Sequence, residues 1–152
     1  MAPLLASHAR VTLAGASETT VGLSDYLDRR DLRSGSAVVA VEVERQEGLT
    51  GYWYSHARTR LNYPLFTVAV LGRADAGLVR ELRIVVTGIV GRYARLAGLE
   101  TRLEGTPPRA ISSDELGVTI PDRQGESGDY LTHRAAVAVG RGLDAIAAGG
   151  AP

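Results

Sequence analysis

The chain has 152 residues, of which 45% are apolar, so it is long enough to form one domain with a substantial core. Its 17 basic and 17 acidic side chains give a formal net charge of zero, which argues against a general nucleic-acid binder. There is no cysteine and every basic residue is arginine. This excludes disulfides, thiolate metal sites and mechanisms that depend on a lysine.

The first third of the sequence predicts a small antiparallel sheet. Residues 9–14 alternate in polarity, residues 15–17 can turn, and residues 19–23 suit a second strand, so the pair is a candidate hairpin. Ser24 can cap a short helix that runs through residue 30. Residues 37–44 are rich in valine, which favours another strand.

The middle of the sequence predicts a meander of three strands. Residues 52–60 alternate aromatic with polar or basic side chains, which is the periodicity of a strand. Residues 65–71 and 78–87 are two further strand-like segments, and residues 75–77 can turn between them. Strands joined by such short connections pair antiparallel.

The last third is helical in character. One helix is predicted to begin near Tyr93, because Tyr93, Leu96, Leu99 and Leu103 recur at helical spacing before Gly105. Residues 112–115 have the spacing of a capping box and predict one short helix. A last helix is predicted from a cap at Ser127 to a stop at residues 149–150, with apolar or small residues at Leu131, Ala135, Ala138, Gly142 and Ile146.

Strands first and helices last indicate an α+β fold. We expect one domain, residues 1–152, that is strand-rich over 9–89 and helical over 92–147, with an antiparallel sheet and helices packed on one face. No secretory signal or membrane-length apolar run is visible, so a cytoplasmic protein without membrane or nucleic-acid partners is expected. The composition, rich in arginine, alanine and glycine, is typical of a GC-rich bacterial genome.

The aromatic residues gather in one stretch with histidine and arginine between them. Rings supply flat apolar walls, while Tyr, His and Arg supply hydrogen-bond donors at fixed points, a combination that suits a pocket for a largely apolar molecule. The alternative is that these residues have a structural role and form one face of a sheet that packs on helices. Strand parity also separates Trp53 from its two tyrosine neighbours. The cluster consists of Tyr52, Trp53, Tyr54, His56, Arg58, Arg60, Tyr63 and Phe66.

The order of these segments resembles the C-terminal half of the flavin-binding (medium) subunit of molybdenum hydroxylases, the carbon monoxide dehydrogenase and xanthine dehydrogenase family. The resemblance covers roughly residues 9–147. Residues 58–70 (R-T-R-L-N-Y-P-L-F-T-V-A-V) are similar to the family's S-R-x-x-D-F-P-x-V-x-V-A stretch. Further similar segments are residues 11–27, 36–44, 83–89, 99–105, 122–134 and 140–143.

The resemblance implies the fold of that subunit's C-terminal domain. The family holds its flavin diphosphate mainly with glycine-rich loops of the subunit's first half, which would precede residue 1 here. The family's glycine pair is replaced by Thr87 and Gly88. Because the chain starts with methionine, we expect a standalone protein. Because it lacks those loops, we expect that it binds no cofactor, and we expect no metal ion.

The sequence leaves three functions open. The first is a cofactor-free cyclase or isomerase of bacterial polyketide-type metabolism, acting as a homodimer on a small apolar substrate by holding it in a reactive shape. Its expected catalytic residues are Tyr54, His56 and Arg58, and its expected substrate-binding residues are Trp53, Tyr63, Phe66 and Tyr93. The second is a split flavin-subunit fragment that works in electron transfer with molybdenum-hydroxylase subunits and FAD. The third is a non-catalytic interaction domain.

Overall fold

The computed structural model describes residues 1–59 and 62–149. The N-terminal part forms a small sheet in the order β2-β1-β3, with both pairings antiparallel. Its elements are α1 (Ala2–Ala6), β1 (Arg10–Ala14), β2 (Glu18–Gly22), α2 (Leu23–Asp28), α3 (Arg30–Arg33) and β3 (Ala37–Glu42). The predicted hairpin and the valine-rich strand are therefore confirmed.

The rest of the chain forms a large sheet in the order β4-β5-β6-β7, again antiparallel throughout. This is the predicted meander with one strand added. The elements are β4 (Thr50–His56), β5 (Phe66–Asp75), β6 (Leu78–Ile89), β7 (Arg92–Arg95), α4 (Ala97–Leu103), α5 (Ser113–Leu116) and α6 (Gly128–Ala147). Ala76 and Gly77, both with positive φ, make the tight turn between β5 and β6.

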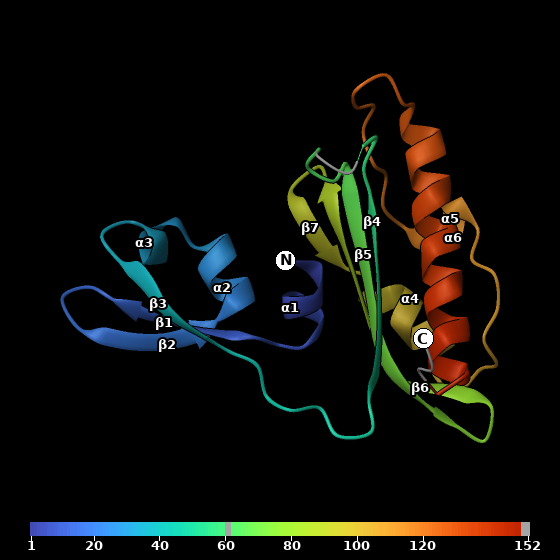
Figure 1. Ribbon diagram of the computed structural model, residues 1–152, viewed down its shortest axis with the longest axis horizontal. Coiled ribbons are helices and arrows are strands. Elements are labelled where there is room, and N and C mark those ends of the chain that lie inside the picture. Colours follow the sequence, from blue (N-terminus) through green and yellow to red (C-terminus); the bar gives the residue numbers. More distant parts are fainter. Residues whose placement is uncertain (60–61, 150–152) are drawn as a thin grey trace.

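Helices cover both faces of the large sheet, as Figure 1 shows. The long helix α6 packs along one face against β4 and β5, with α4 beside it on β6. On the opposite face α1 packs against β5 and β6 and separates the large sheet from the small one. The α+β class and the antiparallel sheet with helices packed on it are confirmed. The predicted helices α4 and α6 lie on one face, and α1 on the other face is an addition that the sequence did not indicate.

Two apolar cores hold these layers together. The larger lies between the large sheet and α6, where Phe66, Ile84, Leu131 and Leu143 are almost fully buried. The smaller lies between the small sheet and the opposite face of the large sheet. It combines side chains of α1, β1 and α2 with Ala69 of β5 and Val85 of β6.

Helix α6 begins and packs as its sequence indicates. The Ser127 hydroxyl accepts a hydrogen bond from the Tyr130 amide at 3.3 Å, which satisfies one unpaired N–H of the first turn. Further along, Gly142 lies against Val70 of β5 and leaves no room for a side chain. Of the predicted stop at residues 149–150, Gly150 lies outside the described residues. No helix in the described part is long and apolar enough to cross a membrane.

Two predicted boundaries need correction. Tyr93 lies in β7, paired with Thr87 of β6, and the helix predicted to begin near it starts at Ala97. The strand predicted over residues 52–60 ends at His56, because its partner strand begins opposite it at Phe66. Arg60, the last residue of that predicted strand, lies outside the described residues.

Candidate functional site

The pairing register of the large sheet divides the aromatic residues between its two faces. Tyr54 is opposite Val68, whose side chain belongs to the core under α6. Trp53 is opposite Ala69, whose side chain belongs to the core on the α1 side. Because neighbouring residues of a strand point to opposite faces, the side chains of Tyr54 and Trp53 cannot enter the same pocket.

On the α6 face, Tyr54 and His56 belong to one hydrogen-bonded network. His56 Nε2 lies 2.7 Å from Glu126 Oε2, and its Nδ1 lies 3.2 Å from the Tyr54 hydroxyl. The Arg134 guanidinium of α6 donates to the same hydroxyl at 2.7 Å. A neutral histidine with its proton on Nε2 satisfies this chain, since Nε2 donates to Glu126 and Nδ1 accepts from Tyr54.

Aromatic contacts fix the position of the His56 ring. It stacks on Phe66 at 5.2 Å between ring centroids and meets the edge of Tyr130 at 6.2 Å. The His56 side chain is 13% exposed and that of Glu126 is 22% exposed. These hydrogen bonds tie β4 to α6 and to the loop before it, although Arg134 Nε is buried without a hydrogen-bond partner.

Arg58 lies at the same end of the sheet. Its guanidinium donates to the backbone carbonyl of Gln124 at 2.9 Å. The loop that contains Gln124 and Glu126 therefore brings Arg58 close to His56. The structure thus gathers four of the expected site residues at one end of the α6 face: Tyr54, His56, Arg58 and Phe66.

Sequence reasoning missed two members of this network. Glu126 is 70 positions from His56, and Arg134 is 80 positions from Tyr54. The sequence features that could have indicated them are a carboxylate in the polar loop immediately before the last helix and an arginine in the second turn of that helix.

The other three expected site residues lie elsewhere, so the single pocket that we expected is not formed. Trp53 is 65% exposed on the α1 face, and Tyr63 is 93% exposed. The Tyr93 hydroxyl donates to the Asp28 carboxylate of α2 at 3.0 Å. Burial, together with this hydrogen bond, raises the pKa of Tyr93 to about 12, so its phenol stays protonated.

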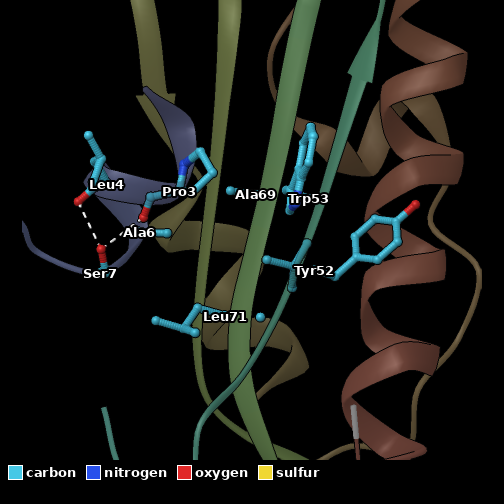
Figure 2. Close-up of a pocket in the computed structure, with 10 residues that line it drawn as sticks. Pro3, Leu4, Ala6, Ser7, Tyr52, Trp53, Ala69 and Leu71 are labelled. Atoms are coloured by element: carbon cyan, nitrogen blue, oxygen red, sulfur yellow. Dashed lines mark hydrogen bonds between the residues drawn. The ribbon is translucent and has the colours of Figure 1, made fainter. Parts of the chain in front are cut away.

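Trp53 borders an apolar pocket of about 250 Å³ between α1 and the large sheet. Figure 2 shows Pro3 and Ala6 of α1 across from Trp53, while the Tyr52 ring points away toward α6. The pocket offers a flat wall for one ring-sized apolar group. Its lining residues, none of which carries a charge, are Pro3, Leu4, Ala6, Ser7, Gly51, Tyr52, Trp53, Ala69, Val70 and Leu71.

Known proteins resemble this chain in fold rather than in sequence. No protein-family model matches the chain, and no curated protein matches its sequence. The carbon monoxide dehydrogenase of Hydrogenophaga pseudoflava, in a form that lacks the Mo-pyranopterin moiety of its molybdenum cofactor, superposes with a TM-score of 0.84 at 22% identity. That match covers 99% of this chain and 56% of the solved one.

Two further solved chains superpose similarly. Quinoline 2-oxidoreductase from Pseudomonas putida 86 matches with a TM-score of 0.80 at 20% identity, over 97% of this chain and 55% of its own. Reconstituted carbon monoxide dehydrogenase from Oligotropha carboxidovorans matches with a TM-score of 0.76 at 17% identity, over 97% and 55%. The fold is that of the carbon monoxide dehydrogenase flavoprotein. The chain spans about half the length of these relatives, and its fold resembles a C-terminal, FAD-binding-domain-like part of them.

These relatives correct one expectation. The expectation that the chain binds no cofactor is contradicted, because the proteins that share its fold are FAD and molybdenum-cofactor enzymes. The pocket beside Trp53 does not fit a whole dinucleotide, since its 250 Å³ falls below the ~300–1,000 Å³ of usual ligand pockets and its lining has no charged donor for a diphosphate. Within the described residues, no group of three or more His, Asp or Glu could hold a metal ion.

Proposed function

We propose that this chain is the C-terminal portion of a flavin-binding subunit and acts with partner subunits of a molybdenum hydroxylase in electron transfer. The support is an asymmetry in the comparisons. The match takes in nearly all of this chain, 97–99%, but only 55–56% of each solved chain. In the proposed assembly, a partner polypeptide supplies the remainder of the same fold.

The observation that carries the proposal is the exposure of β3. A strand of a packed sheet normally buries alternate side chains, yet all six residues of β3 are exposed. Val38, Val39 and Val41 are 40%, 56% and 51% exposed, and Val43, just beyond the strand, is 50% exposed. We call these four residues the β3 valine patch.

The position of β3 adds an unpaired backbone edge to this patch. In the order β2-β1-β3, β3 pairs only with β1, so its other side presents free N–H and C=O groups. An apolar edge strand whose only charged residue is Glu42, at its end, is a site for a further strand or layer. The N-terminal part of the flavin subunit is the occupant we infer, because the matched fold continues by a little under half a chain in the solved relatives.

This proposal explains more of the observations than the hypothesis of a cofactor-free cyclase or isomerase does. The solved relatives are dehydrogenases and oxidoreductases by their descriptions. The residues expected to fold a substrate lie on opposite faces of the sheet, and both ring nitrogens of His56 and the Tyr54 hydroxyl already have partners within the chain. A protein that completes a larger subunit needs a docking face rather than a closed substrate cavity of its own.

Co-expression tests the proposal. The chain is produced together with a polypeptide encoded beside its gene that has the fold of the N-terminal part of a flavin-binding subunit. Light scattering and flavin absorbance are then measured on the purified product. We expect a one-to-one complex that retains flavin. A chain that stays free of every such polypeptide would contradict the proposal.

Matched variants locate the contact. In Val39→Asp/Val41→Asp, docking would bury two unpaired carboxylates, so the complex should weaken at least a hundredfold while the free chain melts normally. Val90→Asp is the control, because Val90 is 81% exposed in the turn between β6 and β7. Equal loss in both variants would refute the role of β3. A homodimer of the free chain that only the double variant abolishes would assign the patch to a second copy instead.

A further inference from the structure

Three arginines line one pocket between α3 and the turn that leads into β7. Arg30 and Arg33 are three positions apart on α3 and so share one side of it. Arg92 is the first residue of β7. With Ser34 they line a shallow pocket of about 410 Å³ that is widely open to solvent. We call it the arginine pocket.

One carboxylate of α3 and one of α2 are engaged with other side chains. The Asp31 carboxylate is 2.6 Å from Arg29, and the Asp28 carboxylate accepts the Tyr93 hydroxyl. None of the ion pairs among residues 1–59 and 62–149 involves an arginine of the pocket. Three positive charges therefore face one cavity without an internal counter-charge in a chain whose net charge is zero.

Two further observations concern the arginines of the pocket. Among the described residues, two buried side-chain donors lack a hydrogen-bond partner, Arg134 Nε on α6 and Arg33 Nε in this pocket, and each has lost its hydration without replacement. Arg92 has a φ of 82°, a conformation that favours glycine and strains other residues. Such backbone strain persists at sites where the side chain has a role, and the strained residue here carries the guanidinium that lines the pocket opposite α3.

We propose that the arginine pocket binds a phosphate-bearing small molecule. Guanidinium groups match the oxygens of a phosphoryl group with paired, charge-assisted hydrogen bonds, and the Ser34 hydroxyl can add one more. The cavity has the size of usual small-molecule pockets. The ligand bridges α3 of the small-sheet part to β7 of the large sheet. This inference does not depend on the proposed function, because it concerns the isolated chain.

Calorimetric titration of the purified chain with pyrophosphate tests the site. We expect saturable binding that weakens as sodium chloride is raised, since the contacts are partly exposed charges. Arg33→Gln should lower the affinity about tenfold through loss of one charge-assisted contact. Arg141→Gln is the control, because Arg141 is exposed on α6, away from the pocket, and the change removes the same charge.

A second variant separates binding from folding. Arg92→Gly removes a guanidinium but relieves the positive φ, so it should weaken pyrophosphate binding about tenfold while the melting temperature stays equal or rises. Titration with ADP and with inorganic phosphate identifies the source of the phosphoryl group: tighter binding of ADP than of pyrophosphate indicates a nucleotide, and equal binding indicates the phosphoryl group alone. Absence of saturable binding, equal losses in Arg33→Gln and Arg141→Gln, or citrate binding as tight as pyrophosphate would overturn the proposal.

Discussion

Helix α6 approaches the large sheet so closely at Gly142 that the smallest added side chain should disturb it. A Cβ at this position would lie 2.6 Å from Val70 Cγ2, 2.9 Å from Val70 Cβ and 3.0 Å from Tyr52 Cδ1. Val70 is β-branched and only 1% exposed, so it cannot move aside cheaply. Helix α6 itself must shift, which alters the contact that brings Arg134 to Tyr54.

Two opposing terms decide the stability of Gly142→Ala. Alanine gains about 1 kcal/mol over glycine in a helix interior. Overpacking a buried contact costs about 1–3 kcal/mol, and a clash with two atoms of one rigid side chain belongs at or above the upper end of that range. We therefore expect a net loss of about 2 kcal/mol, or a melting temperature lower by roughly 4–8 °C for a chain of this size.

Gly140 in the same helix is the matched control. The nearest atom to a Cβ there, Ala110 Cα, is 3.5 Å away, an ordinary contact, so Gly140→Ala should raise the melting temperature by roughly 2–4 °C. Thermal melts followed by circular dichroism compare the two variants. In a Val70→Ala background the loss caused by Gly142→Ala should shrink, because the clashing methyl group is gone. Gly142→Ala melting at or above the wild type would refute this account of the packing.

Three other substitutions test separate contacts. Tyr93→Phe should cost about 1 kcal/mol at neutral pH, because it removes the hydrogen bond to Asp28. The pKa of Tyr93 is raised from 10 to about 12 in the folded state, so this contribution to stability is lost as the pH rises from 10 to about 12. The difference in melting temperature between wild type and Tyr93→Phe should therefore shrink over that range, and a constant difference would contradict the shift. Glu100→Ala should cost about 2–4 kcal/mol in urea unfolding, because it leaves the buried amide of Ile84 without its acceptor at 2.8 Å; a loss below 1 kcal/mol would argue against that role. Leu143→Ala should cost about 2–5 kcal/mol in the same assay, because Leu143 is 0% exposed in the main core, and a neutral result would place it outside that core.

The strands of the large sheet were predictable because their signals are local. Valine-rich segments at β5 and β6 are separated by Ala76 and Gly77, a turn of two residues, and two residues are enough to fix an antiparallel pair. Alternation along β4 also predicted that Tyr54 and His56 share a face and that Trp53 does not.

The error at Tyr93 has a physical cause. Tyr93 and Leu96 are three residues apart, which suits a helix, but their real relation is a strand followed by the turn before α4. Tyr93 lies in a strand because it pairs with Thr87 on β6, and that pairing depends on a turn in which Gly91 and Arg92 both have positive φ. An arginine in that conformation gives no sequence signal of a turn.

The site was only partly predictable for a similar reason. Tyr54, His56 and Phe66 lie within 13 positions of one another in the sequence, whereas their partners Glu126 and Arg134 arrive from the far end of the chain. Periodicity reports which face a side chain occupies, but it does not report which loop folds over that face.

The smaller core has a consequence for how the protein is made. Side chains of α1, β1 and α2 are synthesised first, but the surface on which they pack includes Ala69 and Val85, which leave the ribosome much later. Until β5 and β6 have been synthesised, the apolar side chains of the small sheet and the edge of β3 remain exposed. Such exposure favours aggregation or binding by a chaperone. The meander and α6 bury their own, larger core and do not depend on the small sheet in this way. The larger core, which needs no residue of the small sheet, can be completed once α6 has emerged, whereas the smaller core begins earlier in the chain and cannot be completed before β6 is made.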